Sequence, residues 1–132
     1  MRLLADWSIR HGGATRKVEL LQGDLARLPA DQSVDVLVVS AFQNDYLPTQ
    51  GSLIGALDRA GLSVQDLASH KQVDLRQSYS SWLSAPVGKG LNFRHVLCIE
   101  TGWRHGKSTS RAAITDDLFR ALAPYLTDGL PE

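Results

Sequence analysis

The residues best suited to chemistry lie between positions 18 and 61. Asp24 follows Gly23 just after the predicted strand 17–21. Glycine lets the backbone turn sharply there, and the carboxylate can then accept a hydrogen bond from a bound base or cap the helix start in "LARL". Both interpretations stay open at this stage.

The loop Ser40–Gly51 is the stronger indication of a binding site. It leaves the apolar β-branched run 34–40 and enters a helix start, "GSLIGALDRA". Unpaired backbone N–H groups and the helix dipole attract anions at such a junction, and open α/β sheets usually bind ligands at that edge. We therefore expect a ligand loop, with a junction that binds nothing as the alternative.

Four side chains of this loop have two interpretations each. Asn44 and Asp45 could hydrogen-bond a ribose or orient a water, which makes them the weak catalytic candidates, or they could form an Asx-turn that shapes the loop. Phe42 and Tyr46 could stack on a sugar or base, or pack into the core. None of the four identifies a reaction.

The remaining candidates are weaker. Trp103, Arg104, His105 and Lys107 lie in one Gly-containing loop, which could grip phosphate or form an ordinary exposed turn. The four histidines are scattered without metal-ligand spacing, so we predict no metal and no cofactor. Cys98 lies in an apolar run with nothing to lower its pKa, which indicates an inert core residue.

Bulk composition limits the classes of function. The chain has 132 residues, which predicts one domain, and it carries 14 basic and 14 acidic residues. A net charge of zero gives no general attraction to nucleic acid or to an anionic membrane. A single cysteine, no signal-like segment and no long apolar run lead us to expect a soluble, cytoplasmic protein.

Hydrophobic periodicity predicts an α/β fold in which a mixed β-sheet of about five strands is flanked by helices in three layers. Turn residues at 11–13 indicate a hairpin, and the apolar run 34–40 is typical of a central strand. The predicted strands are 3–9, 17–21, 34–40, 73–87 and 95–100. The predicted helices are 51–60 with Ser52 as N-cap and Gly61 as stop, 63–71 with Ser63 as N-cap, and 112–126, which Pro124 should end or kink.

The order of these segments along the chain resembles that of the macro domain, an α/β module associated with ADP-ribose. The similar pieces are "LLQGDLARL", "VDVLVVSA", "GSLIGALDRAG", "HVLCIETGWRHG" and "LFRALAPYL". The resemblance implies that Asp24 contacts the adenine amino group and that Ser40 and Ala41 line the distal ribose. It also implies that backbone N–H groups wrap the diphosphate at Gly51, Ser52, Leu53 and Ile54.

Departures from the family pattern shape the functional expectation. Ser40-Ala41-Phe42-Gln43 replaces the family's asparagine motif, and Pro48-Thr49-Gln50-Gly51 replaces its glycine run. Macro domains also continue beyond the segment that resembles "LFRALAPYL". This leads us to expect a chain that is incomplete at its C-terminus, or a homodimer or partner chain that covers an exposed sheet edge.

We therefore expect a divergent macro-like module, residues 1–132, that binds ADP-ribose or a related adenine nucleotide without catalysis. The alternatives are a hydrolase of ADP-ribosyl or nucleotide phosphodiester bonds, and a degenerate scaffold for protein–protein interaction. The expected ligand contacts are Asp24, Ser40, Ala41, Phe42, Asn44, Tyr46, Gly51, Ser52, Leu53 and Ile54.

Overall fold

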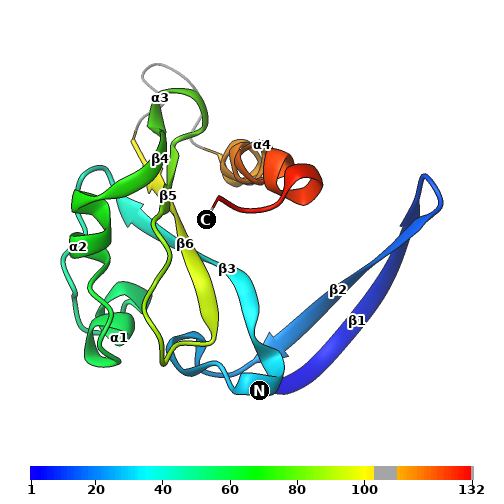
Figure 1. Ribbon diagram of the computed structural model, residues 1–132, viewed down its shortest axis with the longest axis horizontal. Helices are drawn as coiled ribbons and strands as arrows, with labels where there is room; N and C mark the ends of the chain where they lie inside the picture. Colours follow the sequence, from blue (N-terminus) through cyan, green and yellow to red (C-terminus); the bar gives the residue numbers. More distant parts are fainter. Residues whose placement is uncertain (103–109, 132) are drawn as a thin grey trace.

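A four-stranded mixed sheet with helices on both faces forms the body of the protein (Figure 1). The computed structural model describes residues 1–102 and 110–131. The strand order is β3-β6-β5-β4, where β3 (Val34–Phe42) pairs with β6 (Phe93–Thr101) in parallel. β5 (Ser81–Ser84) is antiparallel to both β6 and β4 (Lys71–Leu75). The prediction of an α/β fold with a mixed sheet flanked by helices is confirmed.

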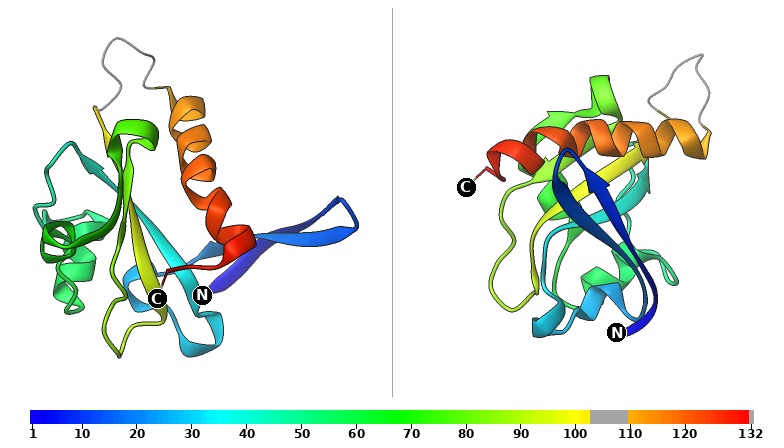
Figure 2. Two further views of the ribbon diagram at one scale, coloured as in Figure 1. Left: turned by 45° about the horizontal axis from the view of Figure 1, so that its top comes forward. Right: turned by 90° about the vertical axis from the view of Figure 1, so that its right-hand side faces the viewer.

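Each face of the sheet has its own apolar cluster. On one face, Leu37 and Val39 of β3 pack against α1 (Leu53–Arg59) and α2 (Val64–Ser69). On the other face, Leu97 packs against α4 (Arg111–Asp128). The helices cover opposite sides of the sheet in the views of Figure 1 and Figure 2. Covering both faces keeps the apolar run of β3 away from water.

Two strand predictions are wrong. β3 is an edge strand, although its composition predicted a central one. The apolar run of β3 requires only that both faces of the strand are covered. It does not require a neighbouring strand at each edge. The predicted strand 73–87 is interrupted by α3 (Arg76–Tyr79) and by Ser80 at φ 52°, so β4 and β5 are two antiparallel strands.

The first two strands form a separate sheet instead of joining the main one. β1 (Arg2–His11) and β2 (Ala14–Gln22) pair only with each other among the described strands, as an antiparallel ribbon. Gly12 and Gly13 make the turn with φ of 58° and 81°, which confirms the predicted hairpin. Figure 2 shows this ribbon projecting away from the body. The expected five-stranded sheet is therefore replaced by a sheet of four and a ribbon of two.

The helix predictions are largely confirmed. Ser52 and Ser63 accept hydrogen bonds from Gly55 N–H and Asp66 N–H, as N-caps of α1 and α2. α4, however, continues through Pro124 to Asp128, so the expectation that Pro124 ends the helix is wrong. No helix in the described residues has the length and apolar character needed to cross a membrane.

Candidate functional site

A cavity of about 250 Å³ lies where the parallel strands β3 and β6 end. Phe42 and Thr101, the last residues of these strands, are paired across the ladder. The loop from 43 to 52 leaves this edge and leads into α1, so strand ends, loop and helix start enclose the cavity. It is lined by Ser40, Ala41, Phe42, Asp45, Leu47, Thr49, Ser52, Ile54 and Thr101.

The loop beside this cavity is shaped by its own hydrogen bonds. Asn44 adopts φ of 55°, a left-handed conformation that asparagine tolerates better than most residues. Asp45 N–H donates to Phe42 O at 3.0 Å, and Asp45 Oδ1 accepts from Leu47 N–H at 3.2 Å. The Asx-turn alternative is thus confirmed for Asp45, whose side chain both lines the cavity and fixes the loop.

The start of α1 is occupied largely by its own cap. Ser52 Oγ accepts from Gly55 N–H at 2.9 Å and donates to Thr49 O at 2.8 Å. Ser52 N–H also donates to Thr49 O, at 3.3 Å. Gly51 reaches this geometry at φ of 82°, which favours glycine. Two of the amide groups near the expected diphosphate loop therefore already have acceptors within the chain.

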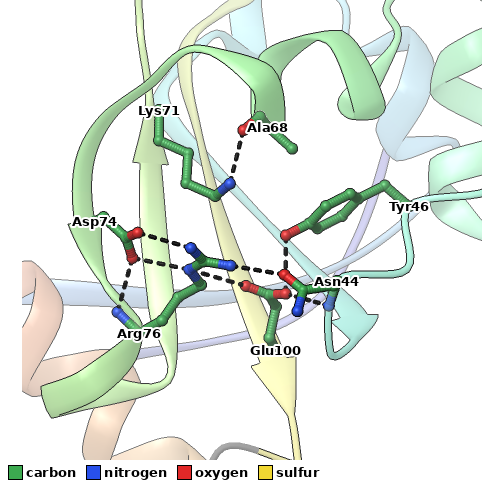
Figure 3. Close-up of polar contacts among 7 residues, drawn as sticks. All are labelled: Asn44, Tyr46, Ala68, Lys71, Asp74, Arg76 and Glu100. Atoms are coloured by element: carbon green, nitrogen blue, oxygen red, sulfur yellow. Dashed lines mark hydrogen bonds and ion pairs between the residues drawn. The ribbon is translucent and has the colours of Figure 1, made fainter.

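A buried carboxylate that the sequence analysis missed anchors the loop from the other side (Figure 3). Glu100, near the end of β6, is 1% exposed. Its Oε1 accepts from Asn44 N–H at 2.7 Å and from the Tyr46 hydroxyl at 2.8 Å. Burial, together with the hydrogen bond to this carboxylate, raises the pKa of Tyr46. Asn44 and Tyr46 thus hold the loop to β6, 56 and 54 residues further along the chain.

Arg76 connects the same loop to β4. Its Nη1 donates to Asn44 Oδ1 at 2.8 Å, while Nε and Nη2 each lie 2.9 Å from the Asp74 carboxylate. Hydrogen bonding to Arg76 lowers the pKa of Asp74. Arg76 Nε also lies 3.8 Å from Glu100 Oε2, so one guanidinium faces two carboxylates (Figure 3). A glutamate within the apolar run "HVLCIE" was the available signal, since a buried charge needs a partner.

Tyr46 also packs into the core, as the second interpretation of this residue proposed. Its ring meets that of Trp82 edge-on, with centroids 5.7 Å apart and planes at 89°. Lys71 Nζ lies 5.8 Å from the Tyr46 ring and 5.3 Å from the Trp82 ring, and donates to Ala68 O at 2.6 Å. Aromatic packing and the bond to Glu100 together fix the Tyr46 side chain.

The structure brings together part of the expected ligand set. Ser40, Ala41, Phe42, Ser52 and Ile54 line the cavity, as does the weak catalytic candidate Asp45. Gly51 and Leu53 flank Ser52 in the chain, whereas Asn44 and Tyr46 serve the Glu100 network.

Asp24 does not line the cavity. Its carboxylate accepts from Ala26 N–H at 3.0 Å, as N-cap of the 3₁₀ turn η1 (Leu25–Arg27), and lies 3.9 Å from Arg27 Nε. That turn borders a second cavity, of about 440 Å³, with residues of the C-terminal end of α1 and Phe93 at the start of β6. The helix-cap interpretation of Asp24 is therefore the one that is realised.

Three further predictions concern other parts of the chain. Within the described residues, no three His, Cys, Asp or Glu side chains come together in a way that could hold a metal ion. Cys98 is fully buried, and burial raises the pKa of its thiol to about 12. Trp103, Arg104, His105 and Lys107 lie outside the described residues.

Comparison with known proteins gives no relative on which to base an identity. No protein-family model matches the chain, and neither a curated protein nor a solved structure does. The cavity and the polar network must therefore be interpreted from their own geometry.

Proposed function

We propose that the protein binds a small nucleotide, with ADP-ribose or a related adenine nucleotide as the candidate ligand, in the cavity at the ends of β3 and β6. The observation that carries this proposal is the position of the cavity: it lies at the carboxyl edge of the parallel strand pair, beside a strand-loop-helix junction. Ligands of open α/β sheets bind at this edge. The resemblance of residues 18–61 to the macro domain points to the same class of ligand.

In this proposal the sugar is the part that enters the cavity. The Asp45 carboxylate can accept hydrogen bonds from ribose hydroxyls, and the side chains of Thr49 and Thr101 supply further hydroxyl groups. Phe42 is 74% exposed at the same cavity, where its ring can cover a sugar or base. The cap of α1 occupies the Ser52 amide, so we assign the binding energy mainly to the sugar contacts.

The size of the cavity limits the expected affinity. At about 250 Å³ it lies just below the range of roughly 300–1,000 Å³ that is usual for small-molecule sites. It therefore accommodates a ribose with part of its phosphate or base, while the rest of the ligand extends over the opening. A dissociation constant on the order of micromolar is the corresponding expectation.

Calorimetric titration tests the proposal. ADP-ribose, ADP, AMP and NAD are titrated separately into the 132-residue protein, and at least one should give saturable heat. Asp45→Asn keeps the acceptor for Leu47 N–H but removes the charge, and it should weaken binding about tenfold. Asp31→Asn, in the 3₁₀ turn η2 (Ala30–Gln32), is the matched control and should leave the affinity unchanged.

Each element of the proposal has an outcome that contradicts it. Flat traces for all four nucleotides remove the binding function. Equal affinity of Asp45→Asn and wild type removes the role of Asp45. If Asp24→Asn abolishes the preference for adenine nucleotides over uridine nucleotides, the ligand contacts a residue outside this cavity, and the proposed location is wrong.

No observation favours the hydrolase alternative over binding. The Asn44 side chain accepts from Arg76, and Asp45 Oδ1 accepts from the Leu47 amide. Both weak catalytic candidates are thus engaged in holding the loop, which leaves neither well suited to orient an attacking water.

A further inference from the structure

The β1–β2 ribbon has one apolar and one polar face. Its register sets Trp7 opposite Val18 and Ala5 opposite Leu20, with Ile9 on the same side of the ribbon. Directly opposed residues of an antiparallel pair point to the same face, and neighbours along a strand point to opposite faces. Asp6, Ser8, Lys17 and Glu19 therefore share the other face, where Lys17 lies 2.6 Å from Glu19 and 3.6 Å from Asp6.

The apolar face is exposed to solvent along its length. Trp7 is 53% exposed, Ile9 52%, Leu20 51% and Val18 46%. Leu4, in the bulge at the base, is 49% exposed, whereas Leu3, also 49% exposed, lies opposite Leu21 on the other face. Side chains of this size amount to several hundred Å², the scale at which an exposed apolar patch marks an interaction site.

Within residues 1–102 and 110–131, the body does not cover this face. No residue of the ribbon belongs to either of the two apolar clusters of the described residues; Met1, which precedes it, packs against the first. The ribbon projects to one side of the sheet in Figure 1 and in the left view of Figure 2. A two-stranded ribbon standing alone in water is marginally stable, and packing of its apolar face supplies the missing stabilisation. Something outside this chain should therefore cover it.

We propose that a second copy of this chain covers the ribbon, with the apolar faces of the two ribbons packed on each other across a two-fold axis. Such an interface is self-complementary, because each copy presents the same strip of Trp7, Val18 and Leu20. Packing between the apolar faces of two sheets is a common arrangement in proteins. The polar faces with their Lys17 ion pairs remain outside, in water.

Charge selects the antiparallel orientation of the two ribbons. By the register, this face carries two arginines: Arg16 lies opposite Ile9 toward the tip, and Arg2 lies opposite Gln22 at the base. With the ribbons antiparallel about the Val18 row, each Arg16 lies over the Leu20 row of the other ribbon, and both Arg16 and Arg2 are kept apart from their own symmetry mates. With the tips together, the two Arg16 guanidinium groups would meet and repel, and so would the two Arg2 groups. The antiparallel arrangement also keeps the two bodies apart.

The area available predicts a reversible dimer. The two apolar faces together bury on the order of 1,000 Å², near the lower limit of stable interfaces. The chain has no net charge, so no overall repulsion opposes association. We expect a monomer–dimer equilibrium in the micromolar range of concentration.

Sedimentation equilibrium of the full chain over micromolar concentrations tests the proposal. Wild type should approach twice the mass of one chain and no higher. Trp7→Glu should be monomeric throughout, because it buries a charge in the interface, whereas Ser8→Glu on the polar face should dimerise as wild type does. Circular dichroism confirms that both variants are folded. A monomeric wild type, a dimer that survives Trp7→Glu, or open-ended association would each overturn the proposal.

Cross-linking tests the ribbon-to-ribbon geometry without disrupting it. Val18 lies near the middle of the ladder, so the two Val18 residues of a dimer lie near the two-fold axis. Val18→Cys should give a cross-linked dimer with a short bis-maleimide, while Ser8→Cys should not. Wild type is the background control, since its one cysteine, Cys98, is fully buried. Equal yields from the two variants, or none from Val18→Cys, would exclude this packing.

Discussion

The β1–β2 ribbon and the Glu100 network are held together by opposite kinds of contact. Ribbon partners lie at most 20 residues apart, joined by a two-glycine turn, and the apolar side chains remain exposed. The Glu100 network joins residues 44 and 100, and its central carboxylate is almost completely buried. Pairing between residues close in sequence therefore formed a ribbon with an uncovered apolar face. Pairing between residues far apart in sequence buried a carboxylate at one end of the sheet.

This difference predicts where substitutions are costly. In the network, Asn44, Tyr46 and Arg76 all face the buried Glu100 carboxylate, which loses a partner when one of them is removed. In the ribbon, side chains point into water in the monomer, and substitution should affect association more than folding. The following three variants test this contrast, in order of decreasing effect.

Glu100→Ala should have the largest effect on stability. It removes the acceptor of Asn44 N–H and of the Tyr46 hydroxyl, and leaves Arg76 with one carboxylate fewer. Loss of one member of a buried charged network costs about 3 kcal/mol, which urea denaturation of the variant and of wild type would measure. Asp116→Ala, which breaks the exposed pair with Arg120 on α4, should cost about 0.5 kcal/mol or less. Equal losses in the two variants would contradict the importance of the network.

Gly13→Ala should have an intermediate and local effect. Gly13 has φ of 81°, and a methyl group added there would meet no other atom within 4 Å. The expected cost of about 1 kcal/mol is thus purely conformational. Amide hydrogen exchange should quicken in β1 and β2 but remain unchanged in β6. Faster exchange in both regions would show that the ribbon and body unfold as one unit.

Asp74→Asn should have the smallest effect, and it should depend on pH. The pKa of Asp74 is lowered from its ordinary value of 3.8, so its ionised form stabilises the fold. That contribution is present above pH 3.8 and is lost as pH falls through the depressed pKa. Wild type should therefore be more stable than the variant at neutral pH, and the difference should shrink below pH 3.8. Thermal melting at a series of pH values measures it, and a constant difference would contradict the assignment.

Local signals predicted many of the elements and their ends. Gly12 and Gly13 indicated the hairpin, and Ser52 and Ser63 indicated two helix starts, because turn and cap chemistry depends on residues within a few positions. The cavity at the end of β3 was anticipated in the same way, from a strand, a loop and a helix start in succession. By contrast, the edge position of β3 and the break at Ser80 depend on which strands pair, which periodicity does not specify.

The sequence by itself determined the hairpin, the capped helices and an α/β pattern, since each depends on neighbouring residues. The tertiary structure decided that Asp24 caps a turn away from the cavity, and that Glu100, Arg76 and Asn44 meet. It also decided that the ribbon leaves the main sheet with its apolar face uncovered. The physical reason is that burial and charge pairing depend on how distant segments pack. Local composition restricts which residues can be buried or paired, but it does not specify their partners.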